Sequence, residues 1–228
     1  MKISHYFVMV FIITLCGFGL HQALYFGMAS FHNYSVINML KHWQNLPSEH
    51  NNNDYSRIKA EAQQAVLYHP HYAEYWDLLA QVNEWGYIFG YEEHESGLLE
   101  AKKQYLRATE LRPLWPDSWA SLLKLKWRLQ EFDEQMLYYF ERATQLGPHK
   151  PDVHLVVIEL GFALYANNHF MLLNIRPEFH RRLALGLKHP NTRDRVIKLI
   201  SAYESQALVC HWLKNEDLTI RKLIPKCK

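Results

Sequence analysis

Histidine and carboxylate side chains form two short groups that could hold a metal ion. A His-Pro-His triplet occupies residues 69–71, and a Glu-Glu-His-Glu run occupies residues 92–95. Zinc takes three or four converging ligands, and calcium takes regularly spaced oxygens with a Gly-assisted turn. Neither group has such spacing, so we interpret the first as solvated turn residues and the second as an exposed acidic loop. The sequence predicts no metal site and no cofactor.

One cysteine next to a histidine is the pattern closest to a catalytic nucleophile and its base. Cys210 and His211 are adjacent, and adjacent helical side chains point about 100° apart, so they do not face each other. The chain has no Gly-rich phosphate loop, no Gly-x-Ser-x-Gly elbow and no Cys-x2-Cys pair. Its net charge of +2 is too small to indicate nucleic-acid binding. We therefore predict no catalytic residue and no enzymatic activity.

The first thirty residues have a different composition from the rest of the chain. No Lys, Arg, Asp or Glu occurs between Lys2 and Lys41, and residues 6–20 are almost wholly apolar. About 20 such residues cross a hydrocarbon core of about 30 Å. The sequence predicts a transmembrane anchor at residues 1–31. Lys2 and the α-amino group precede this segment, and positive charges favour the cytoplasmic side of a span. We therefore expect the N-terminus in the cytoplasm and the remaining domain in the periplasm.

Two processing questions arise from the same segment. Gly27-Met28-Ala29 resembles a signal-peptidase site, but the apolar stretch is long for a signal peptide, so we expect an uncleaved anchor. An extracytoplasmic location would permit a disulfide between Cys210 and Cys227. The sequence leaves open whether these two cysteines are bonded or remain free thiols.

A polar connector and a repeated phrase organise the remaining residues. Residues 32–53, which include LPSEHNNN at 46–53, are expected to form a juxtamembrane segment and linker. Residues 54–228 would form the folded domain. Within it the phrase Arg-Ala-Thr-x-Leu-x-Pro ends at Pro113 and again at Pro148, 35 residues later. A phrase repeated at such a distance is typical of a stacking structural unit.

Each unit also carries one apolar stripe with helical spacing. Its members recur at positions i, i+4 and i+7, and the stripes are Ile58, Ala62 and Ala65; Ala101, Tyr105 and Ala108; and Met136, Phe140 and Ala143. Small alanines allow paired helices to approach each other closely. The stripes therefore predict helices packed in pairs.

The opening and closing motifs of these units resemble the tetratricopeptide repeat (TPR). Trp76-x2-Leu79-Ala80 and Trp119-x2-Leu122 match its opening, and the alanine stripes followed by Pro match its close. The resemblance implies an all-α fold, in which the transmembrane helix precedes an irregular TPR-like α-solenoid of about four helix pairs with a C-terminal capping helix. The pattern departs from the family in a long insertion at residues 86–97, in a fourth unit without the Ala pair, and in bulky residues where a small one is expected: Leu123, Ile158 and Ile200.

A narrower resemblance covers residues 112–165. Trp115-Pro116-x2-Trp119, Glu141-Arg142-Ala143 and Leu146-Gly147-Pro148-x2-Pro151 are similar to the VpsP-type proteins of bacterial exopolysaccharide gene clusters. That resemblance implies an accessory protein of polysaccharide synthesis or export, associated with the bacterial inner membrane. It assigns no chemistry to these residues.

A stack of helix pairs exposes the first helix of each pair on a concave face that suits a peptide or a partner helix. We expect this face to bind protein partners in an envelope polysaccharide complex, through Asp77, Gln81, Glu84, Lys124, Trp127, Arg128 and Glu159.

Two alternatives remain open. One is a glycan-binding module using aromatic residues near Trp115 and at residues 87–91. The other is an assembly factor of another envelope machine for pili, secretion or cytochrome maturation, because a fold does not determine function.

Overall fold

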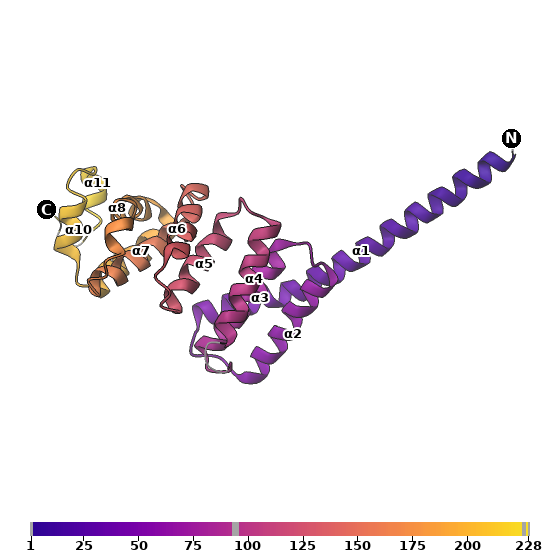
Figure 1. Ribbon diagram of the computed structural model, residues 1–228, viewed down its shortest axis with the longest axis horizontal. Coiled ribbons are helices and arrows are strands. Elements are labelled where there is room, and N and C mark those ends of the chain that lie inside the picture. The colour runs from indigo at the N-terminus through magenta and orange to yellow at the C-terminus, as the bar shows by residue number, and fades with distance from the viewer. Residues whose placement is uncertain (1, 93–95, 225–226, 228) are drawn as a thin grey trace. The chain divides into compact units, whose positions relative to one another are not determined.

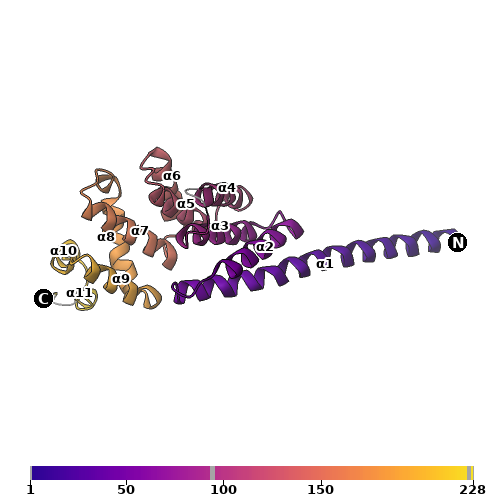
Figure 2. The same ribbon diagram turned by 90° about the horizontal axis from the view of Figure 1, so that it is seen from below.

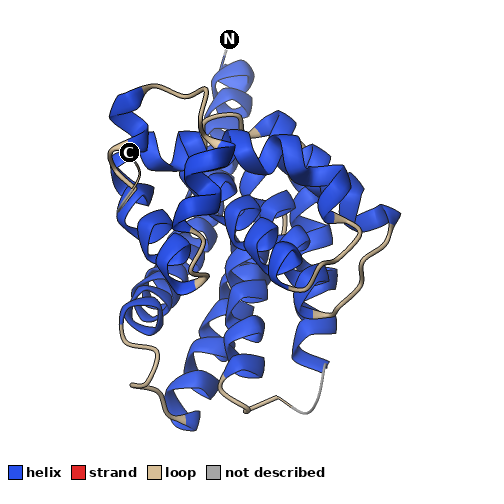
Figure 3. Cartoon of the chain, turned by 90° about the vertical axis from the view of Figure 1, so that its left-hand side faces the viewer, coloured by secondary structure: helices blue, strands red, loops and turns tan. Residues whose placement is uncertain are grey.

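The computed structural model describes residues 2–92, 96–224 and 227, and these residues form eleven helices and no strands (Figures 1 and 3). The helices are α1 Lys2–Asn45, α2 Asn52–Tyr68, α3 Ala73–Ile88, α4 Ser96–Leu111, α5 Pro116–Arg128, α6 Glu134–Leu146, α7 Pro151–Ala166, α8 Leu172–Lys188, α9 Pro190–Ala202, α10 Gln206–Trp212 and α11 Leu218–Arg221. The chain divides by contacts into two compact units, Met1–Pro113 and Leu114–Lys228.

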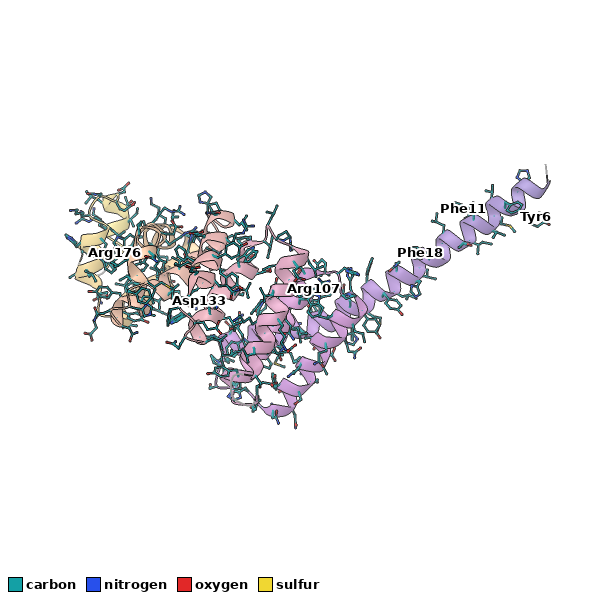
Figure 4. All side chains as sticks on the ribbon, in the orientation of Figure 1. Tyr6, Phe11, Phe18, Arg107, Asp133 and Arg176 are labelled. Atoms are coloured by element: carbon teal, nitrogen blue, oxygen red, sulfur yellow. A yellow bond between two sulfur atoms is a disulfide. The ribbon has the colours of Figure 1, made fainter. Side chains whose placement is uncertain are left out.

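Helix α1 combines a projecting half and a packed half in one unbroken helix (Figure 2). Its residues 6–24 are mostly apolar and exposed, and Tyr6, Phe11 and Phe18 point away from the ribbon with no other element beside them (Figure 4). The helix is long and apolar enough to be a candidate membrane span, with a mean hydropathy of 2.0 in its most apolar window. This property agrees with the predicted anchor.

The C-terminal half of α1 packs as the first helix of a pair. Val36, Leu40 and Trp43 are buried and belong to the same core cluster as Ile58 and Ala62 of α2. Residues 32–45, expected to form a juxtamembrane segment, are therefore helical and packed, and the nonhelical connector is confined to residues 46–51. A side-chain cap explains where the next helix begins, because Asn51 accepts a hydrogen bond from the Asp54 amide at 2.8 Å.

In the first unit α1 pairs with α2 and α3 pairs with α4, while α3 also packs against both α1 and α2. The predicted stripe residues are buried, since Ala62 and Ala65 are 1% exposed and Ala101, Tyr105 and Ala108 are 0% exposed. Ala80, the small residue after the opening Trp-x2-Leu, is also fully buried. The alanine pattern thus forms the seam between paired helices, as predicted.

The insertion between α3 and α4 is anchored to α2. The Tyr55 hydroxyl and the Lys59 ammonium both bond to the carboxylate of Glu92. Gly86 permits this approach, because a Cβ there would overlap the Tyr55 hydroxyl. Glu92 is therefore part of a packed contact and not of an exposed acidic loop. Residues 93–95 of the predicted loop lie outside the described residues.

In the second unit α5 pairs with α6 and α7 pairs with α8, and each first helix packs on the next first helix: α5 on α7, and α7 on α9. Proline begins three of these first helices, at Pro116, Pro151 and Pro190, where the missing N–H costs nothing. Gly161 lets the Phe179 ring lie directly on α7, because a Cβ there would overlap that ring. This arrangement is the TPR-like pairing that the repeats predicted.

The closing segment differs from the expected single capping helix. Residues 190–224 form three short helices, α9, α10 and α11, because the chain turns at Tyr203–Ser205 through a positive φ at Glu204. Cys210 of α10 is bonded to Cys227, with a Cα–Cα distance of 5.6 Å. The sequence left open whether these two cysteines are bonded, and in the structure a disulfide links Cys227 to α10.

Candidate functional site: the first-helix faces and a pocket at the C-terminal end

The three candidate residues of the first unit lie on one face of α3, but they differ in exposure. Asp77 and Gln81 are half-buried, whereas Glu84 is only 5% exposed. The Glu84 carboxylate accepts a hydrogen bond from the Tyr105 hydroxyl at 2.5 Å, and next to it the Asn83 amide donates to Gln104 at 2.8 Å. Glu84 therefore helps to hold α3 against α4, contrary to the expectation that it is exposed.

The candidates of the second unit are half-buried on α5 and α7. Lys124, Trp127 and Arg128 lie near the end of α5, and Glu159 of α7 forms an ion pair with Arg195 of α9 at 2.5 Å. Four of the seven candidates, Asp77, Glu84, Lys124 and Arg128, also make further interactions within the chain. Gln81 and Trp127 are consequently the positions best suited to report on a partner.

A buried lysine that sequence reasoning missed fixes the hairpin between α5 and α6. Lys126 is 3% exposed, and its ammonium lies 2.6 Å from the carboxylates of both Glu131 and Asp133. Burial alone would lower the pKa of Lys126, but the hydrogen bonds to Asp133 and Glu131 outweigh that effect and raise it. Asp133 also caps α6 by accepting from the Met136 amide at 2.9 Å. The cluster is structural: it links the last turn of α5, which carries Trp127, to the start of α6.

A second buried cation, Arg182 of α8, holds the end of α6 against α7 and α8. Its guanidinium donates to the carbonyls of Thr144 at 2.8 Å and Gly147 at 2.7 Å, to Glu178 at 2.6 Å, and to His154 Nδ1 at 2.9 Å. The donor fork of arginine thus satisfies carbonyls that the end of α6 leaves without a helical partner. His154 has to be neutral at Nδ1 to accept such a bond.

His154 makes stability depend on pH. Burial and the nearby Arg182 charge lower the pKa of His154 from 6.5 to about 4. An unfolded chain therefore takes up this proton near pH 6.5, whereas the folded chain does so only near pH 4. The free energy of unfolding should fall by up to about 3 kcal/mol as the pH drops through this window, and the contribution is fully present above it.

A matched variant isolates this contribution from that of the other histidines. His154→Asn keeps an oxygen that can accept from Arg182 and removes the titrating group. Urea unfolding midpoints at several pH values between about 7 and 4 should show a shallower decline for His154→Asn than for the unchanged chain. Equal slopes would show that His154 does not titrate differently in the folded and unfolded states.

The second unit contains an open pocket of about 400 Å³ at its C-terminal end, formed by α7, α8 and α10. Aromatic rings form much of its wall: Trp212 stacks on His180 with a centroid distance of 4.6 Å and meets Phe179 edge-on at 5.5 Å. Burial and the Arg176 charge lower the pKa of His180, which favours the neutral imidazole. Sequence reasoning missed this pocket because its walls are separated by about 40 residues along the chain.

The His-Pro-His turn is only partly solvated, contrary to the expectation from its sequence. His69 stacks on Tyr72 at a centroid distance of 5.5 Å and lies 4.5 Å from Phe26, so it is a packing residue. The disulfide removes the Cys210 thiol from any nucleophilic role. No cluster of three or more His, Cys, Asp or Glu side chains suited to a metal ion occurs in the part of the chain that the structure describes.

Comparison with known proteins gives little further information. No protein-family model matches the chain, and no curated protein matches it significantly. Among solved structures, a chain described under the functional characterization of Pseudomonas aeruginosa pilF aligns with 86% of this chain and 94% of its own length, at 15% sequence identity and a TM-score of 0.29. A similarity this distant carries no argument about function.

Proposed function

We propose that this chain is a membrane-anchored, non-enzymatic scaffold that binds protein partners through its TPR-like helix pairs. The observation that carries the proposal is the continuity of α1, in which an exposed apolar half runs without a break into a half that packs as the first helix of a pair. Residues 1–31 are the proposed anchor in the bacterial inner membrane. The disulfide supports a periplasmic location for the helix pairs, because such bonds persist in oxidising compartments.

The proposed setting is the synthesis or export of a bacterial exopolysaccharide. This part of the proposal comes from the resemblance of residues 112–165 to the VpsP-type proteins. Deleting the gene is expected to reduce secreted polysaccharide while leaving pili and cytochromes intact. The reverse outcome would favour the alternative of an assembly factor for another envelope machine.

The first-helix faces are the proposed partner-binding surface, and photocrosslinking can test each unit separately. A photoreactive residue at Gln81 on α3 should crosslink to a subunit of the polysaccharide machinery, identified by mass spectrometry, whereas one at Gln64 on α2 should not. In the second unit Trp127 on α5 is compared in the same way with Tyr138 on α6. Each control is an accessible residue of matching type on a second helix. Crosslinks at the control positions alone would place the binding surface on the second helices.

The glycan-binding alternative is less well supported, because several of its aromatic rings are already covered. The Lys150 ammonium lies 4.4 Å from the centroid of the Trp115 ring. Tyr91 stacks on Tyr55 at a centroid distance of 5.5 Å, and its hydroxyl bonds to His50 at 2.7 Å. A sugar stacking on these rings would have to displace the existing contacts. We therefore favour protein partners.

A further inference from the structure

The turn between α2 and α3 lies beside the part of α1 where the projecting half meets the packed half. Helix α2 runs back along α1 (Figure 2), and its last residue, Tyr68, reaches Tyr25 and His32 of α1. Tyr68 meets the Tyr25 ring edge-on at a centroid distance of 5.7 Å and stacks on His32 at 5.6 Å. Within the first unit, this turn is therefore the element beside the end of the projecting half, where a membrane spanned by α1 would end.

The length of the projecting half determines where the membrane surface falls. Residues 5–24 contain no charged side chain and are almost entirely exposed, and about 20 helical residues match a hydrocarbon core of about 30 Å. Moving the span toward the C-terminus would carry the exposed imidazole of His71 into hydrocarbon, where a polar group without a partner costs several kcal/mol. Moving it toward the N-terminus would leave the exposed apolar side chains of Leu20 and Leu24 in water. The boundary consequently falls near Tyr25.

The side chains at this level are of the kind found at membrane surfaces. Leu67 is 70% exposed, Tyr72 is 41% exposed, and Phe31 of α1 is 72% exposed. Tyr72 has an apolar ring, and its hydroxyl bonds to Glu74 at 3.1 Å, so one end suits acyl chains and the other suits water. Tyrosine is enriched at both membrane surfaces for this reason.

We propose that residues 67–72 lie in the lipid–water interface, with Leu67 and Tyr72 in contact with the boundary between headgroups and acyl chains. This inference rests on the proposed function in one respect, which is that α1 spans a bilayer. It adds a second attachment beside the span, so that the first unit is seated on the membrane surface and its tilt is restricted. The ligand is the lipid surface itself and not a protein.

Fluorescence quenching in nanodiscs tests this position with the full chain. Cys16→Ala removes the free thiol and leaves the disulfide oxidised, and a single cysteine at position 67 then carries an environment-sensitive fluorophore. The nanodiscs contain phosphatidylcholine with a spin label either near the headgroup or near the chain end. Ser56→Cys, exposed on the same helix about 16 Å farther from the turn, is the matched control, and Ile13→Cys reports on the span.

Quenching at position 13 tests the anchor, and quenching at position 67 tests the interfacial turn. We expect the shallow label to quench position 67 several-fold more strongly than position 56, and the deep label to quench position 13. Quenching at position 13 without quenching at position 67 would overturn the proposed interfacial turn and leave the anchor intact. Quenching at neither position would remove both the anchor and the turn.

Discussion

Replacing Trp43 by alanine is expected to destabilise the first unit by about 3–5 kcal/mol. Trp43 is fully buried, and its ring meets Phe89 edge-on at a centroid distance of 5.2 Å and Trp85 at 6.2 Å. Truncation would leave a cavity where α1 meets α3. Urea unfolding of the full chain in detergent, followed by hydrogen exchange of the α2 and α3 amides, measures the loss in the unit concerned.

Phe31 provides the control for this prediction because it is an aromatic residue of the same helix that is 72% exposed. Phe31→Ala should change the free energy of unfolding by less than about 0.5 kcal/mol. If Trp43→Ala were as mild as Phe31→Ala, residues 32–45 would act as the linker that the sequence suggested, and not as the first helix of a pair.

The helix pairs could be predicted from the sequence because their signals are local. An alanine stripe such as Ala101–Tyr105–Ala108, followed five residues later by proline, specifies both a helix end and a close contact. All three stripe residues are fully buried in the structure. Proline at the start of a helix, as at Pro116, adds a second local signal.

The sequence did not predict that residues 32–45 form the first helix of a pair. Val36, Leu40 and Trp43 have helical spacing, but they follow an uncharged apolar run, so the pattern does not reveal where lipid contact ends and protein contact begins. That boundary depends on which side chains α2 covers. It is a tertiary property, and here α2 covers α1 as far as Tyr25, which the Tyr68 ring contacts.

The candidate site was predicted less well for a related reason. A polar residue on the expected concave face can bind a partner, or it can bond to a neighbouring helix of the same chain. Which of the two occurs depends on the side chains that the neighbouring helix places next to it. Glu84 serves the fold because the Tyr105 hydroxyl reaches it from α4. The pocket beside Trp212 requires residues near 165–180 and 208–212 to meet, and no local pattern predicts that contact.

Replacing Arg182 by methionine should destabilise the second unit by about 3–5 kcal/mol, because one partner of a buried charged network is removed and the others remain. Arg182 is 0% exposed. The substitution keeps most of the side-chain length but leaves the Thr144 and Gly147 carbonyls without their donor and the His154 Nδ1 atom without its partner. Thermal unfolding should show a midpoint lowered by more than about 10 °C.

The neighbouring residue supplies the control for Arg182. Arg181 also bonds to Glu178, at 2.6 and 2.7 Å, but it is exposed, so water can replace its contacts. Arg181→Met should therefore cost about 1 kcal/mol or less. Since both variants remove one positive charge beside the same carboxylate, the difference between them measures what burial, the two carbonyls and the bond to His154 Nδ1 add. Equal losses would mean that Arg182 acts only as a counter-ion to Glu178 and does not hold the end of α6.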